Sequence, residues 1–134
     1  MKLLHQIVGI AVVVVFLLTG QYMDFYYPDK TAISEGMRMM LRSRHIYILL
    51  GGLVNISLGA YFHWHTERWR RVLQLSASSL LLLATLFSVG AFFYEPQVAG
   101  LQRTFTLPAL IGLLTGTLMH LLSGVKRESR SPLE

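Results

Sequence analysis

Four long tracts of this chain contain no Asp, Glu, Lys or Arg, and this feature restricts the fold more than any other. They cover residues 3–21, 46–61, 72–94 and 104–125. A helix needs about 20 apolar residues to cross the roughly 30 Å hydrocarbon core of a bilayer. Each tract reaches or approaches that length. We therefore predict an all-α, polytopic membrane protein, a bundle of four transmembrane helices whose first partner is the lipid bilayer.

The composition agrees with this prediction and excludes several kinds of site. Apolar residues make up 53% of the chain and charged residues only 14%, against about 25% charged in soluble domains. The chain has no cysteine, which excludes disulfides, thiolate-bound zinc or iron–sulfur clusters, and covalently attached haem. The net charge of +5 comes from basic residues just outside the apolar tracts. That placement favours anionic lipid headgroups over nucleic acid.

The helix boundaries follow from prolines, capping residues and charges. We expect one domain, residues 1–134, with helices at residues 3–27, 35–62, 72–94 and 106–125. Pro28 and Pro96 follow the first and third helices, because the residue before a proline is disfavoured in a helix. Ser34 can cap the second helix, whose residues 35–44 we place at the membrane interface. Residues 126–134 form a polar tail.

The distribution of Lys and Arg predicts the orientation. The N-terminus, the second connection and the tail carry seven basic residues, and the other side carries five. The larger group is Lys2, Arg68, Arg70, Arg71, Lys126, Arg127 and Arg130. Because basic residues favour the cytoplasmic side, we expect both termini in the cytoplasm, in a bacterial inner membrane. The first tract lacks the small residues of a cleavage site, so we expect an uncleaved signal anchor.

Two stripes of small residues occur at intervals of four or eight. They consist of Gly51, Asn55 and Gly59 in the second helix, and of Gly112, Gly116 and Gly124 in the fourth. Lipid tails give helices no hydrophobic reason to associate, so small residues that allow close backbone approach are typical of helix contacts. We predict that both stripes pack helices together, with Asn55 adding a hydrogen bond.

The third helix has a mildly polar face. It is formed by Gln74, Ser78, Leu81, Thr85 and Ser88. Hydroxyl groups in such a helix can bond to their own backbone, and we therefore expect a seam between helices. The other interpretation is the lining of a polar path.

Histidines are the candidate ligands. His5, His63, His65 and His120 fall on the predicted inner side, whereas His45 falls on the opposite side. Imidazoles on facing helices are what b-type haem or a transition metal requires. Ionisable groups within membrane segments are functional candidates. A weaker candidate is an outer Cu(I) site, because thioether sulfur suits that ion. Its ligands would be Met37, Met39, Met40 and His45.

No pattern predicts catalysis. The chain has no Gly-rich phosphate loop after a strand, no nucleophile–base spacing and no paired carboxylates in its apolar tracts. We interpret Asp24, Asp29, Glu35 and Glu95 as solvated charges at helix ends.

We expect an accessory or assembly subunit of a larger membrane complex, which acts through other subunits or through self-association. For this function the sequence predicts no particular cofactor. The alternative is a membrane protein that binds haem b or a metal through its inner histidines. A small-molecule transporter ranks third.

Overall fold

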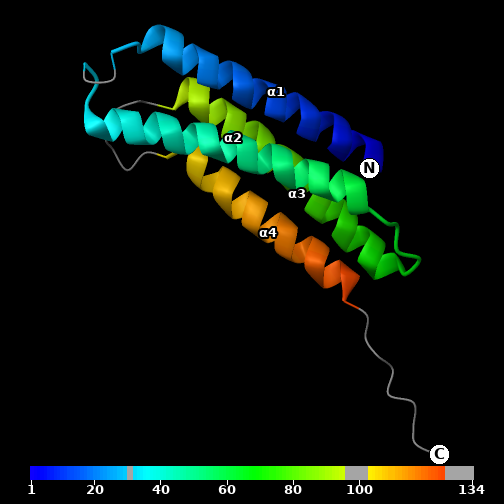
Figure 1. The fold of residues 1–134 in the computed structure, drawn as a ribbon. Helices are drawn as coiled ribbons and strands as arrows, with labels where there is room; N and C mark the ends of the chain where they lie inside the picture. The colour runs from blue at the N-terminus through cyan, green and yellow to red at the C-terminus, as the bar shows by residue number, and fades with distance from the viewer. Residues whose placement is uncertain (30–31, 96–102, 126–134) are drawn as a thin grey trace, which may run out of the picture.

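The computed structural model describes residues 1–29, 32–95 and 103–125, so the predicted tail lies outside the described residues. It contains four helices: α1 (Lys2–Tyr26), α2 (Glu35–Tyr61), α3 (Arg68–Tyr94) and α4 (Thr106–Gly124). Their axes run roughly alongside one another in alternating directions (Figure 1). The prediction of an all-helical bundle with four helices is confirmed.

The two ends of the bundle differ in their chemistry. One end gathers the start of α1, the end of α2, the start of α3 and the end of α4 (Figure 1). We call it the histidine end, because it carries His5, His63, His65 and His120. The ends of α1 and α3 and the starts of α2 and α4 lie at the opposite end.

Three of the helices, α1, α3 and α4, are long and apolar enough to cross a membrane. The described part of α2 falls short of that criterion although it has 27 residues. The reason is local, because Glu35, Arg38, Arg42 and Arg44 all lie in its first three turns. Only the second half of α2 is free of Asp, Glu, Lys and Arg.

The polarity of the bundle is reversed relative to a soluble domain. Large apolar side chains cover the outside of α1, α3 and α4, among them Ile7, Ile10, Leu17, Leu83, Leu86, Ile111 and Leu114. Many polar side chains are buried instead, among them His5, Thr19, Asn55, Gln74, Ser78, Thr85 and Ser88. A continuous apolar exterior is unstable in water and compatible with contact to lipid.

The first hairpin, α1 with α2, depends on close backbone approach at glycines. A Cβ atom on Gly9 would lie 2.7 Å from the backbone nitrogen of Ile56. One on Gly59 would lie 2.8 Å from the backbone nitrogen of Gln6, and one on Gly52 would lie 3.3 Å from the Gly9 carbonyl oxygen. Neither Gly9 nor Gly52 belongs to the stripes singled out in the sequence. They complete the contact that Gly59 begins.

The second hairpin, α3 with α4, uses the glycines of α4. A Cβ on Gly112 would lie 2.8 Å from the Ala84 Cβ, and one on Gly116 would lie 2.6 Å from the Leu81 Cγ. A Cβ on Gly124, the last residue of α4, would meet no described atom within 4 Å. The contact with α3 therefore stops short of Gly124, in contrast to the expectation of packing there.

The helix α3 begins at Arg68, one turn before the hydropathy pattern predicts. The Arg71 N–H donates to the Glu67 carbonyl at 3.1 Å and closes the first turn. Arg70 is buried, pairs with Glu67 (Nε to Oε2, 3.2 Å) and donates to the Val125 carbonyl. Arg70 and Arg71 are therefore part of α3, and both bond to neighbouring residues at the histidine end.

Candidate functional site

A chain of hydrogen bonds crosses three helices in the buried interior. The His5 Nδ1 of α1 lies 2.6 Å from the Asn55 Oδ1 of α2. The Asn55 Nδ2 lies 2.8 Å from the Thr85 Oγ1 of α3 and 2.8 Å from the Gly51 carbonyl oxygen. The Thr85 hydroxyl in turn lies 2.8 Å from the Leu81 carbonyl oxygen. Asn55 thus joins the two hairpins and also holds His5.

The backbone carbonyl groups at the end of this series of hydrogen bonds fix which atoms donate and which accept. A carbonyl oxygen only accepts, so Thr85 donates to Leu81, and Asn55 donates through Nδ2 to both Thr85 and Gly51. The Asn55 Oδ1 is therefore an acceptor, and the His5 Nδ1 must carry the proton that it receives. In the neutral ring, Nε2 of His5 is then the nitrogen with the free lone pair.

That lone pair is enclosed. The side chain of His5 is 0% exposed, and its Nε2 has no hydrogen-bond partner among the described residues. Buried polar atoms are nearly always bonded, and one that is not calls for an explanation such as an ion or ligand. The sequence indicated His5 as one of four candidate ligands, and the structure gives its Nε2 a distinct environment.

His120 of α4 lies next to the His5 ring. The two imidazole centroids are 6.3 Å apart and the ring planes are at 78°. The His120 Nε2 lies 3.1 Å from the hydroxyl oxygen of Ser78 on α3. Phe62, at the end of α2, has its ring centroid 6.1 Å from that of His5 and 5.9 Å from that of His120. The site therefore consists of two imidazoles, each bonded to a neutral polar side chain, with one phenyl ring beside both.

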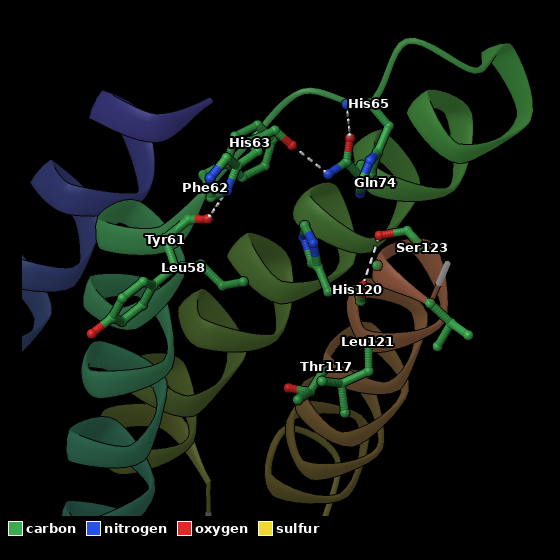
Figure 2. A pocket seen from close by; sticks show the side chains of 12 residues that line it. Leu58, Tyr61, Phe62, His63, His65, Gln74, Thr117, His120, Leu121 and Ser123 are labelled. Carbon is green, nitrogen blue, oxygen red and sulfur yellow. Dashed lines mark hydrogen bonds between the residues drawn. The ribbon is translucent and has the colours of Figure 1, made fainter. Parts of the chain in front are cut away.

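A groove of about 640 Å³ leads from the surface of the histidine end to His120. Figure 2 shows His120 extending from α4 toward the space between the helices. Gln74 shapes the upper part of the groove, because its Nε2 donates to the His63 carbonyl at 2.7 Å and its Oε1 accepts from the His65 N–H at 3.3 Å (Figure 2).

The other two inner histidines line the groove away from this pair. His63 is exposed, and its Nδ1 lies 2.6 Å from the Tyr61 carbonyl oxygen. His65 is partly buried and held by its backbone N–H. Among the described residues, no group of three or more His, Asp or Glu side chains is arranged to hold a metal ion. The structure thus brings together buried His5 and partly buried His120, and places His63 and His65 at the groove that His120 also lines.

The proposed outer copper ligands have different surroundings. Met37 packs against the apolar cluster around Ile48, whereas Met39 is 63% exposed. The Nδ1 of His45 lies 3.0 Å from the Thr19 hydroxyl, and its ring stacks on Phe16 at 4.0 Å. Residues two apart on a helix face different directions, so Met37 and Met39 do not face the same site.

The polar face of α3 forms the expected seam between helices. Thr85 bonds to Asn55, Ser78 bonds to His120, and Ser88 donates to the Ala84 carbonyl at 3.0 Å. Each of the three side chains is buried.

One expectation about charge is wrong. Glu95 was expected to be a solvated helix-end charge, but its side chain is fully enclosed and pairs with Arg44 at 3.2 Å, Nε to Oε2. The guanidinium of Arg44, on another helix, compensates the charge of the Glu95 carboxylate, so this carboxylate does not need to be solvated by water. The sequence gives no signal for this pairing, because the two residues come from separate hairpins.

The chain matches no known protein family, no curated protein and no solved structure in the three comparisons. The fold and the reversed polarity define the class as a helical bundle suited to a membrane.

Proposed function

We propose that this protein crosses the membrane four times and holds a metal centre between His5 and His120. The observation that carries the proposal is the enclosed, unpartnered Nε2 of His5, in a ring whose centroid lies 6.3 Å from that of a second imidazole. We further propose that the histidine end faces the cytoplasm of a bacterial inner membrane, following the excess of Lys and Arg at that end.

The case for four crossings comes from the position of α2 along α1. Gly20 of α1 lies against His45, and Gln6 lies against Gly59. Residues 45–59 of α2 therefore run beside residues 6–20 of α1, over the same depth. If α1 spans the bilayer, the apolar half of α2 spans it as well, and the charged first half extends toward the opposite membrane face.

The case for a metal rests on how the two imidazoles are held. A histidine that binds a metal usually donates its other ring N–H to a fixed acceptor, which sets its orientation and makes it a better ligand. Asn55 has this relation to His5, and Ser78 has it to His120 when the Nε2–H of His120 donates to its hydroxyl. Both rings then present a free lone pair.

The interaction-subunit hypothesis from the sequence needs no metal. In that hypothesis the hydrogen bonds from His5 through Asn55 to Thr85 only hold the helices together. The protein then acts through other subunits or a second copy. The two hypotheses differ in what the purified protein contains.

The test is metal analysis and a visible absorption spectrum of the full chain purified in detergent. We expect a metal, bare or in haem, bound in proportion to the chain. His5→Phe and His120→Phe should lose it, and their helix content by circular dichroism should be unchanged. The control is His45→Phe, which removes a histidine with a protein partner at the opposite end, and it should retain the metal.

A metal-free, colourless preparation that takes up no added metal or haem would contradict the proposal and favour the interaction subunit. Metal that persists in both His5→Phe and His120→Phe would contradict the assignment of the ligands.

A further inference from the structure

We infer that the metal is a single Cu(I) ion held in line by two imidazoles, rather than haem or a divalent ion. This inference rests on the proposed function and identifies the ligand of the same site. It follows from the separation of the His5 and His120 rings, the position of Phe62, and the neutrality of the surrounding side chains.

The ring separation agrees with one ion between two nitrogens. First-row metals bind an imidazole nitrogen at about 2 Å, and the ring centroid lies roughly 1 Å behind that nitrogen. An ion in line between two rings therefore holds their centroids roughly 6 Å apart, close to the 6.3 Å between His5 and His120. Either Cu(I) or a haem iron with two axial imidazoles satisfies this distance.

Phe62 separates these two cases. Its ring is almost equally distant from the two imidazoles, at 6.1 and 5.9 Å, so it lies in the plane midway between them. That is the plane in which the macrocycle of a haem bound by both rings would lie. The three distances put Phe62 about 5 Å from the midpoint, inside the area that a substituted porphyrin covers. A bare ion requires none of that space.

Coordination number separates Cu(I) from zinc. Zn²⁺ in proteins takes four ligands, three of them protein side chains even in catalytic sites. Within the described ranges, no third His, Asp or Glu joins His5 and His120. Cu(I) has a filled d shell and is stable with two ligands in line, and imidazole is a suitable ligand for copper.

The charge of the ion also favours Cu(I) over a divalent metal. The described side chains that hydrogen-bond to the pair or lie beside it, Asn55, Phe62 and Ser78, are neutral, and the N-terminal ammonium adds positive charge near His5. The cost of taking an ion out of water rises with the square of its charge, and buried charge is expensive when it is uncompensated. A monovalent ion on two neutral ligands is therefore favoured over a divalent one. Binding releases no proton, because both ring nitrogens offered to copper carry free lone pairs.

The groove provides access for the ion. It is lined by His63, His65 and His120 and opens at the surface of the histidine end. His120 lies at this groove, and its ring centroid is 6.3 Å from that of His5.

The experiment is a titration of metal-free full-length protein in detergent with Cu(I), under anaerobic reducing conditions and in competition with bicinchoninate. We expect one ion bound per chain, and an X-ray absorption edge with the intense feature of two-coordinate Cu(I). His5→Phe and His120→Phe should abolish this binding, whereas His45→Phe should retain it. Ser78→Ala, which removes the hydroxyl that orients His120, should weaken binding by roughly 10- to 100-fold. Its matched control is Ser88→Ala, which removes a buried serine ten residues further along the same face of α3 that bonds to its own helix backbone and should bind as the wild type does.

Parallel titrations with Zn(II) and with haemin distinguish failure of the Cu(I) inference from failure of the proposed metal site. Saturable Zn(II) or haem binding that depends on His5 and His120, with no Cu(I) binding, would overturn this inference and leave the proposed function standing. Binding of none of the three would overturn both. Cu(I) binding with an edge typical of three or four ligands would overturn the two-coordinate assignment.

Discussion

Arg44 and Glu95 lie 51 residues apart in sequence and form a buried ion pair that ties α2 to the end of α3. The Arg44 Nη1 also donates to the Glu95 backbone carbonyl at 2.9 Å. The Glu95 carboxylate accepts from the backbone N–H groups of Phe105 and Thr106 at 3.3 Å each, and from the Thr106 hydroxyl. One carboxylate therefore satisfies donors at the start of α4 and joins three helices.

We predict that Arg44→Met destabilises the bundle by about 3–5 kcal/mol, because removing one partner of a buried ion pair leaves an uncompensated charge. The measurement is reversible unfolding in mixed micelles, followed by circular dichroism. Arg42→Met is the matched control, since Arg42 is exposed, and it should change the free energy of unfolding by less than about 0.5 kcal/mol. Equal effects of the two substitutions would show that the pair contributes nothing specific.

The contact of α4 with α3 gives a second prediction, with its control in the same stripe. Gly116→Ala places a methyl group against Leu81 and should cost about 1–3 kcal/mol through overpacking. Gly124→Ala meets no described neighbour and should be neutral, or stabilising by up to about 1 kcal/mol from helix propensity. Thermal unfolding in detergent would rank the two variants. If Gly124→Ala is the more damaging, the stripe makes its closest contact elsewhere.

The bond between the hairpins gives a third prediction. Thr85→Val keeps the shape of the side chain but removes the acceptor for the Asn55 amide. It should cost about 0.6 kcal/mol, and at most about 1.7 kcal/mol, the average and the upper value for hydrogen bonds between membrane helices. Thr117→Val is the control, because the Thr117 hydroxyl donates to the Leu113 carbonyl of its own helix. Unfolding free energies of the two variants that do not differ would remove Thr85 from the network.

The sequence predicted the helices because charge-free length and proline placement are local properties. It also predicted that α2 and α4 would use glycine contacts, since close helix packing in lipid has few other solutions. It did not find Gly9 or Gly52, because an isolated glycine and an adjacent pair lack the four-residue spacing that marks a stripe.

The site was only partly predictable for a related reason. His5, His120 and Asn55 were all noted in the sequence, but nothing in it shows that Asn55 bonds to His5 or that Phe62 lies beside both imidazoles. These contacts depend on the register between helices. Gly20 faces His45 and Gln6 faces Gly59, so the numbers of facing residues add to 65 in both pairs. The short first connection limits that sum to a narrow range, yet a shift of one residue would turn His5 away from Asn55.

The fourth prediction concerns orientation and the crossing of α2. The natural chain has no cysteine, so a single introduced cysteine reports on its own position without background. Ala32 and Thr66 are exposed residues on either side of α2, one in each connection. In intact cells, Ala32→Cys should react with a membrane-impermeant maleimide, and Thr66→Cys should react only after the membrane is permeabilised. The reason is the excess of Lys and Arg at the histidine end, which favours retention in the cytoplasm.

Each labelling pattern has a separate consequence. Labelling of Thr66→Cys but not of Ala32→Cys in intact cells would reverse the orientation while keeping four crossings, and the groove would then admit its ion from the outer side. The same accessibility at both positions would mean that α2 does not cross. In that case α1 and α2 could not lie side by side through the bilayer, and Asn55 could not hold His5 within it. The proposed metal centre therefore requires opposite accessibility at these two positions.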